Sequence, residues 1–257
     1  MSVARPLVAR TGLQLININD PHISPRRDPA HVLASLARQT VPMRPMFWSG
    51  RRLPEEYKLL VVAESRADDR PLAVLAADVI RVDSTECLLI DPIFVPADGD
   101  WVLLPKLLAT TLLLAARIGP VPTVIAACLD HPVGYRALRN LAAEFARAAP
   151  GITHYPNPTE VVNFRAAALA RQLAPMICPG HGLALATGVL LGARADLGSR
   201  NVARPAPAGH TAIDAMFARH VGPTDQMLSL IELPPLSGQQ ILDIAQRIRR
   251  RRTRDFA

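Results

Sequence analysis

The sequence predicts an α/β protein with one mixed, mostly antiparallel sheet flanked by helices and a C-terminal α/β extension. Three apolar runs, at 59–63, 71–82 and 86–95, are joined by short connections and predict an antiparallel meander. A strand, helix, strand, helix alternation over 86–148 follows, which predicts a parallel pair of strands buried on both faces. The length of 257 residues suits one large domain with an extension.

The N-terminal part supplies one strand and one helix before the meander. Residues 13–18, LQLINI, alternate well enough between apolar and polar side chains to predict a first strand. Asp28 as N-cap and Pro29 at the first helical position predict a helix that runs to about Gln39. The DDRP sequence at 68–71 predicts a turn inside the meander.

A strand-turn-helix junction, IDPIFVPADGDWVLLPKLL at 90–108, leads out of the meander. The helix is expected over 100–118, because Gly119-Pro120 ends it. The apolar run TVIAACL at 123–129 predicts a buried strand, and a helix is expected from Pro132 to about Ala148. We expect residues 1–150 to form the core.

Residues 151–246 form an extension that completes or covers the sheet. HYPNPTE at 154–160 predicts a turn with Thr159 as N-cap of a helix over 160–173. The apolar segment 183–195 fits either a helix or a strand. A helix over 211–220, a strand over 226–233 and a final helix capped by Ser237 complete the chain. Ile241, Ile244, Ala245 and Ile248 form an apolar stripe that we expect to pack on the body.

The net charge of +7 is concentrated in a basic tail at 247–257. Six of the 29 basic residues are arginines between Arg247 and Arg254, so the remaining 23 nearly balance 22 acidic residues. Charge alone would let the tail bind nucleic acid or an anionic surface. Phe256 is its only aromatic residue, so base stacking is unsupported and nucleic acid is not the expected partner.

Several function classes have no sequence support. The chain shows no membrane-spanning run, no signal peptide and no disulfide framework, so cytoplasmic residence is the expectation. The Gly-x-Ser-x-Gly, P-loop and Rossmann fingerprints are absent. Two Cys-x-x-His pairs, at 128–131 and 178–181, have ligands suited to zinc. Cys128 lies in an apolar run typical of a buried thiol, so no metal is expected.

The order strand, helix, three-strand meander, helix, strand, helix over roughly 13–149 resembles the fold of the GCN5-related N-acetyltransferases (GNAT). In that family the fourth strand and the next helix splay away from the fifth strand, and acyl-CoA lies in the gap. The turn before the helix offers backbone amides to the pyrophosphate. The resemblance implies a fourth strand over 86–95, a turn over 96–99 and a helix from Asp100.

The pyrophosphate-binding signature itself is degenerate in this chain. The family pattern is Arg or Gln, two residues, Gly, one residue, then Gly or Ala. Residues 98–103 read DGDWVL, with one glycine, no arginine or glutamine, and two aspartates that would repel a pyrophosphate. The cofactor-binding residues that the resemblance implies are Ile93, Phe94, Val95, Asp98, Gly99, Asp100 and Trp101.

Four residues are candidates for catalysis. The resemblance implies that Tyr135 protonates the leaving thiolate; the alternative is a half-buried tyrosine at the sheet edge. His131 is a candidate base or a histidine that caps a turn. Family members often place a base on the fourth strand, where Glu86 and Asp91 lie on opposite faces. We favour Asp91, because it precedes Pro92, where a bulge is expected.

The function expected from the resemblance is transfer of an acyl group, by direct attack, from a thioester to a small-molecule or peptide amine. Acetyl-CoA, another acyl-CoA or an acyl carrier protein would supply the thioester. One alternative is a catalytically inactive GNAT-like binding or assembly module. The other is a binder of nucleic acid or an anionic surface through the arginine tail. Assembly as a homodimer stays open.

Overall fold

The computed structural model describes residues 13–18, 31–32, 34–35, 57–65, 70–94, 103–157, 163–193 and 209–250. Its strands are β1 (Leu13–Asn17), β2 (Leu59–Ser65), β3 (Pro71–Val82), β4 (Thr85–Phe94), β5 (Val124–Leu129), β6 (Thr153–Tyr155), β7 (Leu183–Ala184), β8 (Val189–Leu190) and β9 (Gln226–Glu232). Its helices are α2 (Leu103–Ile118), α3 (Pro132–Ala146), α4 (Phe164–Ile177), α5 (Thr211–His220) and α6 (Gly238–Arg250).

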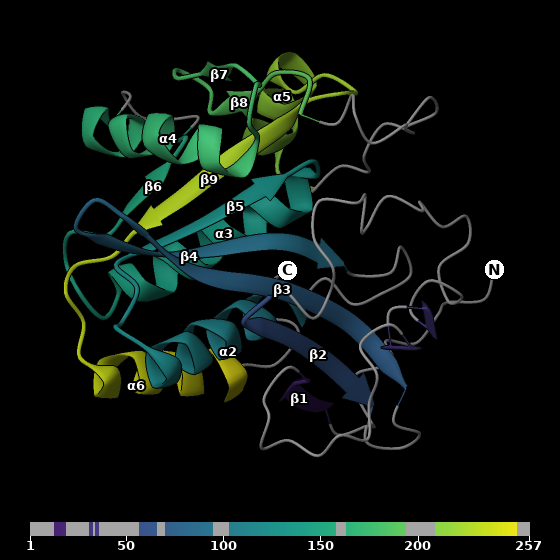
Figure 1. Cartoon of the computed structure of the whole chain (residues 1–257), viewed down its shortest axis with the longest axis vertical. Helices are drawn as coiled ribbons and strands as arrows, with labels where there is room; N and C mark the ends of the chain where they lie inside the picture. The colour runs from purple at the N-terminus through teal and green to yellow at the C-terminus, as the bar shows by residue number, and fades with distance from the viewer. Residues whose placement is uncertain are drawn as a thin grey trace.

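All nine strands belong to one sheet, in the order β1-β2-β3-β4-β5-β9-β8-β7, with β6 also paired to β9 (Figure 1). The antiparallel meander of β2, β3 and β4 is confirmed. The predicted parallel pair is β4 and β5, and every other pairing among the described strands is antiparallel. The fold is therefore α/β with a mixed, mostly antiparallel open sheet.

Helices cover both faces of this sheet. On one face, side chains of α2, α3, α5 and α6 join a core that includes Leu88 and Ile90 of β4. On the other face, α4 packs on a second core that includes Cys87, the residue before Leu88, with Leu89 packed against it. A third cluster places Val32 and Tyr57 on β2 and β3. The side chains of Cys87, Leu88, Leu89 and Ile90 thus alternate between the two cores, as the period of two predicts.

The last helix behaves as the sequence predicts. The Ser237 hydroxyl accepts a hydrogen bond from the Gln240 amide at 3.2 Å, and the Gln240 side chain accepts one from the Ser237 amide at 2.8 Å. This reciprocal arrangement is a capping box. Ile241, Ile244 and Ile248 are at most 1% exposed, and α6 packs against α2. No described helix is both long and apolar enough to cross a membrane.

Two predictions in the extension have the wrong bounds. His154 and Tyr155, expected to open a turn over 154–160, belong to strand β6, because Thr153 and His154 find polar partners in Glu232 and Ser229 of β9. The helix expected over 160–173 begins at Phe164, since the Asn163 side chain accepts hydrogen bonds from the amides of Arg165 and Ala166. Thr159, the predicted N-cap, lies outside the described residues.

The ambiguous segment at 183–195 contains the short hairpin of β7 and β8. Gly188 lies just before β8 with a φ of +70°, and its carbonyl accepts a hydrogen bond from the Leu228 amide at 2.8 Å. The hairpin is thereby attached to the edge of β9. The loop expected over 201–209 is described only at Gly209, and the tail from residue 251 onward lies outside the described part.

Candidate functional site

The pairing between β4 and β5 stops before either strand ends. The parallel register runs from Cys87 opposite Val124 to Ile90 opposite Ala127. Beyond that point β4 continues to Phe94 on β3, and β5 continues to Leu129 on β9. Figure 1 shows the carboxyl ends of the two strands diverging. Ligands of open α/β sheets commonly bind outside the carboxyl ends of the strands.

A bulge accompanies this separation. Ile93 pairs with Leu75 and Ile90 with Ala77, so Asp91 and Pro92 together lie opposite the single residue Ala76. The bulge expected at this dipeptide is confirmed. An extra residue bends the strand that carries it and increases its twist, which accounts for the turn of β4 away from β5.

The separation leaves strand edges to which a ligand can add. No described strand pairs with the β5-facing edge of β4 at 91–94. Edges of this kind present unpaired amide and carbonyl groups, and an extended ligand can add to them as an extra strand. The edge of β4 at 91–94 is therefore suited to a ligand with an extended arm containing amide groups.

Of the seven predicted cofactor-binding residues, the structure describes two, and both lie at this end of β4. Ile93 and Phe94 belong to the strand through their backbones, and nothing is described of their side chains. Val95, Asp98, Gly99, Asp100 and Trp101 lie outside the described residues. Of the predicted strand-turn-helix junction at 90–108, the structure therefore describes the end of strand β4 and the helix α2, which begins at Leu103.

The two acidic residues predicted on β4, Glu86 and Asp91, lie far apart along the strand. Glu86 lies near the start of the strand, directly across from Arg81, whose guanidinium is 3.9 Å from its carboxylate. Asp91 is five residues further along, which at 3.3 Å per residue is roughly 17 Å. Asp91 lies at the bulge where β4 and β5 separate, although its side chain is not described. Only Asp91 is located beside the diverging strand ends.

Tyr135 lies in the first part of α3 and is fully buried. Its hydroxyl donates a hydrogen bond to the carbonyl of Pro156, which follows β6. Its ring packs against His154, with 4.9 Å between the ring centroids, and against Phe217 of α5. Through these contacts Tyr135 connects α3 to β6. Its hydroxyl proton is already donated to a backbone carbonyl.

His131 is the N-cap of α3, as the capping hypothesis predicted. Its Nδ1 accepts a hydrogen bond from the Val133 amide at 3.1 Å, and Pro132 occupies the first helical position. Because a cap satisfies an amide that the helix leaves unpaired, this contact gives His131 a structural role.

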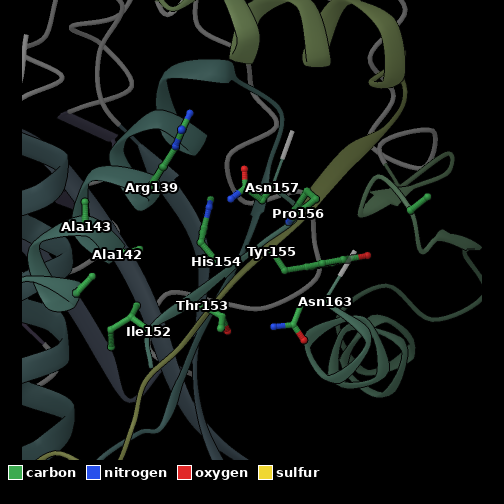
Figure 2. A pocket seen from close by; sticks show the side chains of 12 residues that line it. Arg139, Ala142, Ala143, Ile152, Thr153, His154, Tyr155, Pro156, Asn157 and Asn163 are labelled. Atoms are coloured by element: carbon green, nitrogen blue, oxygen red, sulfur yellow. The ribbon is translucent and has the colours of Figure 1, made fainter. Parts of the chain in front are cut away.

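A pocket of about 290 Å³ lies between α3 and β6, and the sequence interpretation missed it. Its polar lining includes Arg139 of α3, Thr153 and His154 of β6, Asn157 and Asn163 (Figure 2). None of its lining residues belongs to β4 or β5, and β6 pairs with β9 and not with β5, so the pocket is distinct from the end of β4. A sequence signal existed, because Arg139, Ala142, Ala143 and Ala146 recur at helical spacing and place one arginine in a stripe of small residues.

His154 is held neutral in this pocket. Burial, with the nearby Arg139 guanidinium, lowers the pKa of His154 from 6.5 to about 3. Its Nε2 lies 3.0 Å from the Ser229 hydroxyl, while its buried Nδ1 has no hydrogen-bond partner. The imidazole therefore adds no positive charge at neutral pH.

Cys87 is not suited to act as a nucleophile. Burial, with the neighbouring Glu86 carboxylate, raises the pKa of Cys87 to about 11, so the thiol stays protonated. Cys178 is buried in the core beside α4, and His181 lies 3.1 Å from the Leu191 carbonyl through Nδ1. No group of three or more potential metal ligands occurs in the described part of the chain.

Comparison with known proteins does not identify a family for this chain. No protein-family profile, curated protein or solved structure matches the chain. The function is therefore argued from the diverging strands and from the residues around them.

Proposed function

We propose that the protein is an N-acyltransferase with a GNAT-like core, which moves an acyl group from acyl-CoA to an amine. The observation that carries the proposal is the end of the β4–β5 pairing at Ile90 and Ala127, next to the bulge at Asp91. The pantetheine arm of CoA is extended and contains two amide groups. It can add to the unpaired edge of β4 as a short strand.

In the proposed reaction, the neutral amine attacks the thioester carbonyl directly. The new C–N bond forms, the C–S bond breaks, and the ammonium proton passes through water to Asp91. The departing thiolate takes a proton from solvent, because the Tyr135 hydroxyl already donates to the Pro156 carbonyl. The main contribution of the protein is proximity, since the strand edge holds the thioester in place for the amine.

We expect the Asp91→Asn substitution to lower kcat for acyl transfer by about 100-fold, the lower end of the usual contribution of a general base. The matched substitution Glu86→Gln removes a carboxylate at the other end of the same strand and is expected to change kcat less than about twofold. The assay follows thiol release from acetyl-CoA with a panel of amines that contains amino acids, polyamines and lysine peptides. Equal losses in both variants would exclude Asp91 as the base.

A second candidate is a GNAT-like module that binds acyl-CoA without turnover. Tyr135 and His131 were the expected acid and a candidate base. The Tyr135 hydroxyl donates to the Pro156 carbonyl and the His131 ring caps α3, and these structural contacts favour the second candidate. Acetyl-CoA binding without thiol release for any amine in the panel would support this candidate over the enzyme.

A further inference from the structure

Among the described residues that line the pocket between α3 and β6, one side chain is cationic and none is acidic. Arg139 lines it together with neutral polar groups and with Ala142, Ala143 and Ala146. The nearest carboxylate of β9, Glu232, is occupied by Arg165 of α4 at 2.6 Å and by the Thr153 hydroxyl. The pocket therefore carries an uncompensated positive charge.

The Arg139 guanidinium lacks a partner within the described part of the protein. The side chain is half-buried, and its Nη1 is buried without a hydrogen-bond acceptor. Leaving this buried nitrogen without an acceptor costs free energy, and an anion that accepts a hydrogen bond from it recovers that cost. Figure 2 shows Arg139, His154 and Asn157 in one region of the pocket.

We propose that this pocket binds a small molecule through a carboxylate group, with the Arg139 guanidinium as its principal partner. A guanidinium presents two parallel N–H groups that match a carboxylate. The three alanines of α3 leave space for a compact apolar part of the ligand. This site is separate from the proposed acyl-CoA site and does not depend on it.

The charge of the pocket selects a carboxylate over a phosphate. Arg139 is the only cationic group in the lining, because His154 is neutral at pH 7. One guanidinium neutralises a carboxylate fully. A phosphate group carries a charge of roughly −1.5 to −2 at this pH and would remain partly uncompensated. We therefore expect inorganic phosphate to bind more weakly than a carboxylate.

Calorimetry and ligand-observed NMR test this proposal with acetate, benzoate and succinate, each beside its neutral amide, and with inorganic phosphate. At least one carboxylate is expected to bind about tenfold more tightly than its amide and than phosphate. Arg139→Gln should abolish this preference. The control Arg171→Gln makes the same change on the exposed side of α4 and should leave the preference intact.

If Arg139→Gln fails to fold, the comparison of acids with their amides in the unmodified protein still tests the proposal. No preference for any of the three carboxylates would overturn the proposal. A stronger affinity for phosphate, or a carboxylate preference that survives in folded Arg139→Gln, would overturn it as well.

Discussion

Replacing Gly188 with alanine is expected to lower the free energy of unfolding by about 3 kcal/mol or more. An added Cβ would lie 2.8 Å from the Leu228 carbonyl oxygen and 3.0 Å from Cδ of Pro156. Leu228 belongs to central strand β9 and cannot move aside cheaply. The positive φ of +70° adds a conformational cost for any residue with a side chain.

The control for this prediction is Gly180→Ala. Gly180 has a φ of +82°, but an added Cβ would meet no atom within 4 Å. We therefore expect only the conformational cost, about 1 kcal/mol. Urea unfolding of both variants gives the comparison. Similar losses at the two positions would show that the contact of Gly188 with β9 and Pro156 does not matter.

Stability is expected to fall by about 3 kcal/mol between pH 7 and pH 4 through His154 alone. The folded pKa of about 3 lies below the unfolded value of 6.5, so between them the unfolded chain binds a proton that the folded protein excludes. The stabilisation is fully present above about pH 6.5. It decreases by about 1.4 kcal/mol per unit as the pH falls toward 3.

Urea unfolding at several pH values checks this dependence. In the His154→Gln variant the loss between pH 7 and pH 4 should be about 3 kcal/mol smaller than in the unmodified protein, since the titrating group is gone. Comparison of the two proteins removes the contribution of carboxylates, which titrate in the same range. His220→Gln, at an exposed position, should keep the full dependence. If His154→Gln also keeps it, the histidine is not the responsible group.

The sequence predicted the sheet well where its signals are local. Apolar runs with short connections predicted β2, β3 and β4, and the continuous run at 123–129 predicted the parallel strand β5. Asp91-Pro92 predicted the bulge, because proline cannot donate a ladder hydrogen bond. Ser237 predicted the cap of α6. Each of these features depends on residues close together in the chain.

Features that depend on distant partners were missed. The Thr-His-Tyr sequence of β6 is polar, and it forms a strand only because β9 supplies Ser229 and Glu232, more than 70 residues away. The same distance concealed the pocket, since Arg139 and His154 meet only when α3 packs beside β6. The burial of Tyr135 and its bond to Pro156 likewise depend on the extension beyond residue 150.

The central claim is that acyl-CoA binds where β4 and β5 separate, and its most direct test is calorimetry of the folded protein with acetyl-CoA. We expect one molecule to bind per chain, with a Kd of roughly 1 to 100 μM, within the usual range of enzyme substrates. ADP, which lacks the pantetheine arm, should bind at least about tenfold more weakly, because the strand edge recognises that arm. Absence of acetyl-CoA binding at 1 mM, or equal affinity for ADP, would contradict the claim.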